Sequence, residues 1–159
     1  MSRFFRQLMR ARMFGHPIHA MLVHFPSALF PVSLALDVLA RLSGGSSFAV
    51  AAFYAIAGGL LGGAAAAVFG AMDYFRLPAT HAAWKKASLH ALLNFVWLMW
   101  FGVLFGLRLK QYPQIESATT IEIILSGVAV AGLLFSNFLG GELVFRHKLG
   151  VIEKDSTST

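Results

Sequence analysis

The chain has 159 residues, of which 57% are hydrophobic and only 13% are charged, and its mean hydropathy is +0.69. Soluble globular domains are about 45–50% apolar and about 25% charged, so this composition argues against a soluble fold and excludes a disordered chain. The absence of cysteine excludes disulfides, thiolate metal sites, iron–sulfur clusters and covalently attached haem. The length is sufficient for four membrane crossings of about 20 apolar residues each.

Four long apolar segments divide the chain, and each is long enough to cross a bilayer as a helix. None shows the alternation of apolar and polar residues that is typical of a membrane β-barrel strand. Their connections are short, which favours antiparallel neighbours. We therefore expect an all-α, transmembrane four-helix up-down bundle over residues 17–152, with no internal sequence repeat of comparable strength. The expected spans are residues 17–40, 48–73, 88–108 and 121–145.

The basic residues predict how the bundle is oriented. Ten of the 13 Lys and Arg residues fall at the two termini and in the linker between the second and third spans. The positive-inside rule then predicts that both termini lie in the cytoplasm. Because these charges flank the spans and form no separate basic domain, they do not indicate nucleic-acid binding. Residues 1–16 mix Arg with Phe, Leu and Met, which predicts an interfacial helix or a simple basic anchor, and residues 153–159 form a polar tail.

The second span is rich in glycine. Gly58 and Gly62 are four residues apart, as are Gly59 and Gly63. This spacing places small residues on one helix face and lets two helix backbones approach closely. We therefore expect the second helix to pack tightly inside the bundle or against a second copy of itself.

Two acidic residues lie near the ends of the predicted spans, and each has a basic residue one helical turn away. Asp73 is expected to pair with Arg76, or with the basic N-terminal segment. Asp37 and Arg41 are four residues apart near the opposite membrane face, which predicts a second local ion pair.

All six histidines map to the end of the bundle that holds both termini. Ionisable residues inside membrane spans are rare and indicate a function. His24 lies about two turns inside the first span and His90 opens the third, so we expect these two imidazoles to face each other at similar depth. Further candidate metal ligands at this end are His16, His19 and His147. The polar residues expected to support the site are Asp73, Asn94 and Asn137.

A neutral imidazole ligates haem iron, zinc or copper through one ring nitrogen. We therefore expect His24 and His90 to bind a b-type haem or a divalent metal ion in a redox role, with a membrane quinone or a membrane redox partner. Two alternatives stay open. One is a non-catalytic accessory subunit, whose glycine-rich face at Gly62 binds a partner or a second copy to form a homo-oligomer. The other is a small transporter or proton-conducting protein. No P-loop, metalloprotease or hydrolase motif is present, so a stand-alone enzyme is not expected.

Two segments carry a family resemblance: residues 15–26 read GHPIHAMLVHFP, and residues 140–151 read GGELVFRHKLGV. With the glycine-rich second span and the His at the head of the third, they resemble the predicted membrane proteins of the domain-of-unknown-function family numbered 2231. The resemblance covers residues 15–151 and implies a small four-span protein of the bacterial inner membrane, without supplying an activity. Family members usually have a glycine after the late histidine, where this chain has Lys148. The matching motif residues are His16, Pro17, His19, His24, Pro26, Asp73, His90, Gly140, Gly141 and His147.

Overall fold

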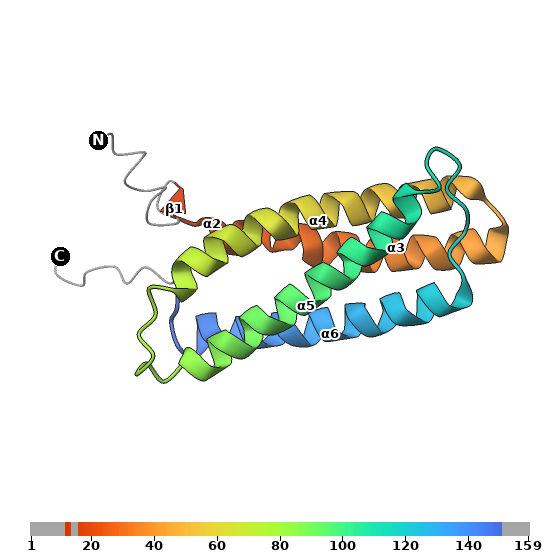
Figure 1. The fold of residues 1–159 in the computed structure, drawn as a ribbon. Coiled ribbons are helices and arrows are strands. Elements are labelled where there is room, and N and C mark those ends of the chain that lie inside the picture. The colour runs from red at the N-terminus through yellow and green to blue at the C-terminus, as the bar shows by residue number, and fades with distance from the viewer. Residues whose placement is uncertain (1–11, 14–15, 151–159) are drawn as a thin grey trace, which may run out of the picture.

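The computed structural model describes residues 12–13 and 16–150 (Figure 1). Helices dominate it, and a two-residue antiparallel ladder precedes the first of them. The ladder pairs β1 (Arg12–Met13) with β2 (His16–Pro17). The helices are α2 (Ile18–Leu22), α3 (His24–Ser43), α4 (Ser46–Tyr74), α5 (Trp84–Leu109) and α6 (Thr120–Phe145).

Four helical segments are long and apolar enough to cross a membrane, with α2 and α3 counted together as one of them. Each overlaps one of the spans expected from the sequence. The predicted all-α, four-helix transmembrane fold is therefore confirmed, and the chain is a multi-pass membrane protein. The side of the membrane on which the termini lie stays a prediction.

The helices run up and down along a common axis (Figure 1). One end of the bundle, called the terminal end below, holds the start of α2, the end of α6 and the linker 75–83. The opposite end, called the loop end, holds the connections 44–45 and 110–119. The chain thus forms two successive hairpins, the first made of α2, α3 and α4 and the second of α5 and α6.

Local chemistry explains where the helices break. Pro26 has no N–H to donate to the carbonyl of Leu22, and its ring crowds that carbonyl, so the first helix is interrupted at Val23. Gly44 ends α3 in the left-handed conformation, with φ 67°, and its N–H donates to the carbonyl of Ala40. The N-terminus of α6 carries a reciprocal capping box between Thr119 and Glu122.

The glycine-rich face of α4 is covered from inside the bundle. A Cβ atom on Gly59 would lie 2.5 Å from Cε1 of Phe30, and one on Gly62 would collide with Phe25. Gly58 likewise meets Leu29 of the same helix, α3. The glycines therefore allow close approach of α3 and α4, as the spacing predicted. Because side chains of α3 already occupy this face, it is not open to a partner protein or to a second copy, which was the other expectation.

At mid-depth the bundle is closed by aromatic stacking. The rings of Phe30 and Phe101 stack with centroids 3.8 Å apart and planes within 3°. Both are fully buried, and they pack with Ile56, Leu104 and Leu133 in one core cluster. Side chains of all four long helices meet here, so this cluster holds the two hairpins together.

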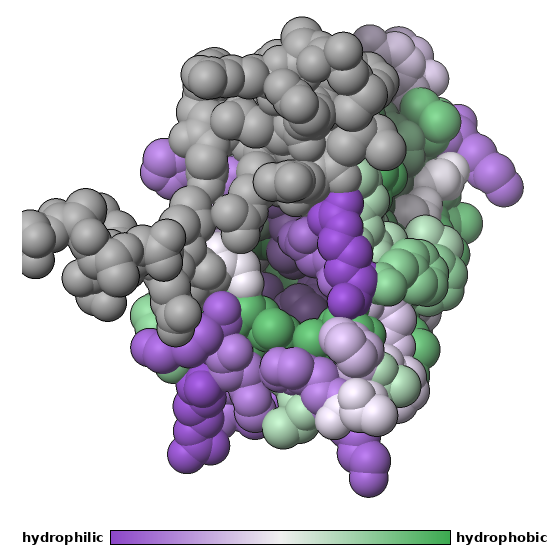
Figure 2. All heavy atoms as spheres, turned by 90° about the vertical axis from the view of Figure 1, so that its left-hand side faces the viewer, coloured by the Kyte–Doolittle hydropathy of each residue, from purple (hydrophilic) through white to green (hydrophobic). Residues whose placement is uncertain are grey.

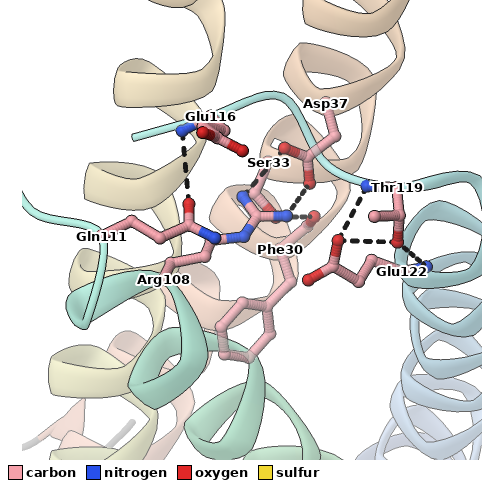
Figure 3. A network of polar contacts seen from close by, with 8 residues as sticks. All are labelled: Phe30, Ser33, Asp37, Arg108, Gln111, Glu116, Thr119 and Glu122. Carbon is pink, nitrogen blue, oxygen red and sulfur yellow. Dashed lines mark hydrogen bonds and ion pairs between the residues drawn. The ribbon is translucent and has the colours of Figure 1, made fainter. Parts of the chain in front are cut away.

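An ion pair crosses the core near the loop end (Figure 3). Arg108 donates from Nη1 to Oδ1 of Asp37 at 2.8 Å and from Nη2 to Oδ2 at 2.7 Å. Asp37 is 1% and Arg108 3% exposed. The expectation that Asp37 pairs with Arg41 is therefore wrong: Arg41 is exposed. A buried carboxylate needs a hydrogen-bonding partner inside the core. Arg108, from α5, approaches Asp37 there with both terminal nitrogens of its guanidinium group.

Candidate functional site

The interior of the terminal end is polar, whereas the middle of the bundle is aromatic and aliphatic. Viewed from this end, the surface is hollowed between the helices, and hydrophilic residues colour the floor of the hollow (Figure 2). Polar side chains of three of the four spans form hydrogen bonds to other helices in the interior of this end. They are His19 in α2, Ser27 in α3, His90 and Asn94 in α5, and Ser136 and Asn137 in α6.

His19 is fixed against α4 by one hydrogen bond. Its Nδ1 donates to the carbonyl oxygen of Ala66 at 2.8 Å. Since a carbonyl only accepts, Nδ1 carries the proton and Nε2 keeps its lone pair. The ring rests on Gly70, where a Cβ atom would lie 2.8 Å from both Nδ1 and Cε1 of His19. The glycine thus lets the imidazole approach α4 by its Nδ1 side, with Nε2 the atom left for a ligand.

His90 is fixed against α6 in the same manner. Its Nδ1 donates to the carbonyl oxygen of Ser136 at 2.9 Å, and a Cβ atom on Gly140 would lie 2.9 Å from its Cε1. The amide nitrogen of Asn94 donates to the hydroxyl of Ser136 at 2.8 Å and to the backbone carbonyl of His90 at 2.9 Å. The same amide nitrogen lies within hydrogen-bond distance of Nε2 of His90, at 3.2 Å, so its two hydrogens are shared among these three acceptors.

The two imidazoles lie next to each other across the hollow end of the bundle. Their ring centroids are 6.4 Å apart, and the ring planes are nearly perpendicular, at 85°. One ring comes from the first hairpin and the other from the second. Each ring has its proton on Nδ1 and a lone pair on Nε2, which is the tautomer that a metal ligand requires.

The sequence predicts that His24 faces His90, and this prediction is wrong. His24 is exposed, and its Nδ1 donates to the carbonyl of Met21, within its own turn, at 3.1 Å. It begins α3, beyond the interruption at Val23, whereas His19 lies in α2. The histidine whose ring lies against His90 is therefore His19.

The remaining predicted site residues are spread around the terminal end. His16 lies exposed on β2, and His147 is half-buried just beyond α6. Asp73 pairs with Arg76 at 3.4 Å in an exposed ion pair, as one of the two expectations had it. Asn137 donates to the hydroxyl of Ser27 at 3.0 Å and ties α6 to α3. Within residues 12–13 and 16–150, no three His, Asp or Glu side chains are close enough to hold a metal ion, so His16, His19 and His147 form no common site there.

His19 and His90 occupy equivalent positions in an internal repeat, which the sequence reading missed. Residues 18–22 read IHAML and residues 89–93 read LHALL, at an offset of 71 residues. In the second helix of each hairpin, Ala66 and Gly70 correspond to Ser136 and Gly140 at an offset of 70. The repeat therefore includes the imidazole, the carbonyl that it donates to and the glycine beneath it.

Three contacts between equivalent residues define an axis through the bundle. His19 meets His90, Phe30 stacks on Phe101, and Asp37 pairs with Arg108, each at the offset of 71. A residue that touches its own counterpart lies on the two-fold axis that relates the two copies. Positions 30 and 37 are seven residues apart on α3 and lie within about 20° of one helix face, and His19 lies beyond them toward the terminal end, so the axis runs along the bundle. The two hairpins are thus related by a pseudo-two-fold axis, and the paired imidazoles lie on it.

The rim of this end has a further residue that the sequence reading missed. Glu142, in α6, accepts hydrogen bonds from Lys86 of α5 at 2.5 Å and from Arg146 at 3.0 Å. The spacing of four residues between Glu142 and Arg146 predicts an ion pair on one helix face. The bond to Lys86 joins residues 56 positions apart, so no local pattern in the sequence predicts it. Glu142 closes the second hairpin just outside Gly140 and His90.

Comparison with known proteins gives a family and no characterised relative. The chain has no significant match among curated proteins or among solved structures. The family of predicted membrane proteins designated DUF2231 matches residues 15–153, which is most of the chain and includes both hairpins and both histidines of the axis. The resemblance inferred from the two end motifs is thereby confirmed, and the chain belongs to this family.

Proposed function

We propose that the protein is a membrane redox protein that binds one b-type haem between its two hairpins, with His19 and His90 as the axial ligands. The observation that carries this proposal is the pair of facing imidazoles, each with its Nδ1 proton donated to a backbone carbonyl. Such a bond orients the ring and leaves Nε2 as the ligand atom, which is how ligating histidines are usually held.

The spacing of the rings supports coordination of one ion. A metal–imidazole bond is about 2.0–2.1 Å long, so two imidazoles on opposite sides of one ion have centroids about 6 Å apart. The centroids of His19 and His90 are 6.4 Å apart. His24, which is exposed and donates to its own turn, is not positioned for this role, and we assign it to His19 instead.

Haem fits the pair better than a bare metal ion. Haem iron brings four ring nitrogens of its own and needs two ligands from the protein, whereas Zn²⁺ at a structural site takes four. His19 would hold the iron from the first hairpin and His90 would hold it from the second. The hollow of Figure 2 opens at this end. Electron exchange with a membrane quinone or a partner oxidoreductase of the bacterial inner membrane would follow from such a site.

An absorption spectrum tests the proposal. The protein is expressed with adequate haem supply, purified in detergent and recorded as isolated and after dithionite. We expect a Soret band and, on reduction, sharp α and β bands of a six-coordinate iron. His19→Ala and His90→Ala should each lose the sharp α and β bands, and His24→Ala, the matched control, should keep them. A featureless spectrum of the wild type contradicts haem binding, and elemental analysis of the same sample then tests for a bare metal ion.

The same contacts favour a second function, that of an accessory subunit without a cofactor. In it, the bonds from His19 to Ala66 and from His90 to Ser136 hold helices together and do no chemistry. Here His19→Ala and His90→Ala would lower the thermal stability of a colourless protein. The spectrum separates the two functions, because loss of these hydrogen bonds lowers the stability of the haem-free protein under either one.

A further inference from the structure

The turn that follows α6 is held against the start of α5. Ala83, Ala87 and Leu143 form a buried cluster at this place, and Leu149, in the turn, packs against it. The N–H of Leu149 also donates to the carbonyl of Leu143 at 3.1 Å, so the turn folds back on the end of its own helix. Basic residues that are distant in sequence are thereby brought to one part of the terminal end.

Four cations of this region, called the basic rim below, share one carboxylate. The cations are Lys85, Lys86, Arg146 and Lys148, and the carboxylate is Glu142. Glu142 is already paired with Lys86 and with Arg146. Within residues 12–13 and 16–150, Lys85 and Lys148 form no ion pair, and both are exposed. The basic rim therefore carries positive charge that its own carboxylate does not compensate.

The backbone of Lys148 is unusual for a lysine. Its φ is 56°, in the left-handed region. This conformation is strained for a residue that has a Cβ atom, whereas glycine adopts it freely. Because glycine would suit the backbone better, a strained and exposed lysine indicates that its side chain has a function.

The basic rim lies at the level of the lipid headgroups. Phe145, the last residue of α6, is 81% exposed, and Phe75, which follows α4 at the same end of the bundle, is 82% exposed. Exposed aromatic rings at the ends of membrane spans leave water for the boundary between acyl chains and headgroups. Arg146 follows Phe145 directly and Lys148 is three residues beyond it, so these cations reach the lipid phosphates.

We propose that the basic rim binds the phosphate group of an anionic phospholipid headgroup, such as that of phosphatidylglycerol, through Lys85 and Lys148. Ammonium groups bind phosphate as point charges, and their flexible stems reach it from two separate elements. Lys86 and Arg146 neutralise Glu142, so its carboxylate does not repel the phosphate. The site does not involve the paired imidazoles and is independent of the proposed haem.

Native mass spectrometry of the full-length protein in neutral detergent tests the proposal. The protein is titrated with phosphatidylglycerol and, separately, with phosphatidylcholine, and we expect phosphatidylglycerol to bind more tightly. Lys85→Gln and Lys148→Gly should each weaken its binding about 5-fold, as expected for one basic residue near a lipid phosphate. Lys148→Arg keeps the charge and should bind as the wild type does. So should Lys110→Gln, the matched control, which removes an exposed lysine at the loop end.

Thermal melts keep a binding role apart from a structural one. Lys148→Gly should melt at the same temperature as the wild type or higher, because glycine adopts the left-handed conformation without strain. Weaker lipid binding by a protein of unchanged stability supports the proposal, and Lys85→Gln provides the same comparison if the glycine variant unfolds.

Three results would overturn the proposal. The first is equal affinity of the wild type for phosphatidylglycerol and phosphatidylcholine. The second is wild-type affinity for phosphatidylglycerol in both Lys85→Gln and Lys148→Gly. The third is inorganic phosphate that binds as tightly as the lipid in a calorimetric titration, since the ligand would then be a free anion.

Discussion

Asp37 and Arg108 occupy equivalent positions in the two hairpins and pair with each other across the pseudo-two-fold axis. Both oxygens of the carboxylate and two nitrogens of the guanidinium take part, at 2.8 and 2.7 Å. The pair is buried, so neither charge has water as a substitute partner. It is the structural counterpart, near the loop end, of the paired imidazoles near the terminal end.

Removal of one member of this pair is expected to destabilise the bundle. Arg108→Ala leaves Asp37 buried without a partner, which typically costs about 3–5 kcal/mol. Arg41→Ala is the control, because Arg41 is exposed. Unfolding of both variants in mixed detergent micelles checks the prediction. Equal stability of the two variants would show that the buried pair contributes no more than a surface arginine.

Exchange of the two charges tests the axis. Because positions 37 and 108 are equivalent, Asp37→Arg combined with Arg108→Asp should rebuild the pair in the opposite sense. We expect the double variant to recover most of the stability that either single variant loses, measured as a coupling energy in a double-mutant cycle. A double variant as unstable as the sum of the singles would contradict the equivalence of the two positions.

Glycine positions on the inner and outer faces should respond to alanine in opposite ways. Gly59→Ala places a Cβ atom 2.5 Å from Cε1 of Phe30, so we expect a loss of about 1–3 kcal/mol from overpacking. Gly102→Ala meets nothing within 4 Å and should be neutral or slightly stabilising, since alanine is the better helix former. Thermal melts in detergent measure both. A stable Gly59→Ala protein would mean that Phe30 can move away from α4.

The glycine beneath His90 is expected to matter for the site. Gly140→Ala places a Cβ atom 2.9 Å from Cε1 of His90 and displaces the ring, while Gly141→Ala, one residue on, meets nothing within 4 Å. If His90 ligates haem, the first variant should lose the sharp α and β bands of the reduced spectrum and the second should keep them. The reverse pattern would mean that the ligand packs against another face of α6.

The membrane orientation is testable with reporters at both termini. Ten of the 13 basic residues fall in the two terminal segments and in the linker between the second and third spans, which predicts that a reporter active only in the cytoplasm is active at either terminus. A cysteine introduced at Gln114, in the loop 110–119, should react with a membrane-impermeant thiol reagent from the opposite side, since the chain has no cysteine of its own. Labelling from the cytoplasmic side would invert the assignment.

The fold was predictable because each span is a continuous apolar segment whose length alone matches a bilayer. The site was predictable only in part. His90 was identified because it lies at the head of a span. That His19 lies beside it depends on the interruption of the helix at Val23 and on the orientation of α2, and composition predicts neither. The Asp37–Arg108 pair joins residues 71 positions apart, so local spacing favoured Arg41 instead. The repeat that relates the two hairpins can be recognised in residues 18–22 and 89–93. In the rest of the apolar segments the two copies are too dissimilar for the repeat to be recognised from sequence.

The charge difference on the axis restricts which hairpins can associate. On a true two-fold axis, position 37 of one copy would face position 37 of the other, so two first hairpins would bury two carboxylates and two second hairpins would bury two guanidinium groups. Like charges that face each other in a dry core repel strongly. Each hairpin is therefore barred from pairing with its own kind and is complementary to the other kind. A gene encoding the two halves as separate polypeptides would be expected to give heterodimers only.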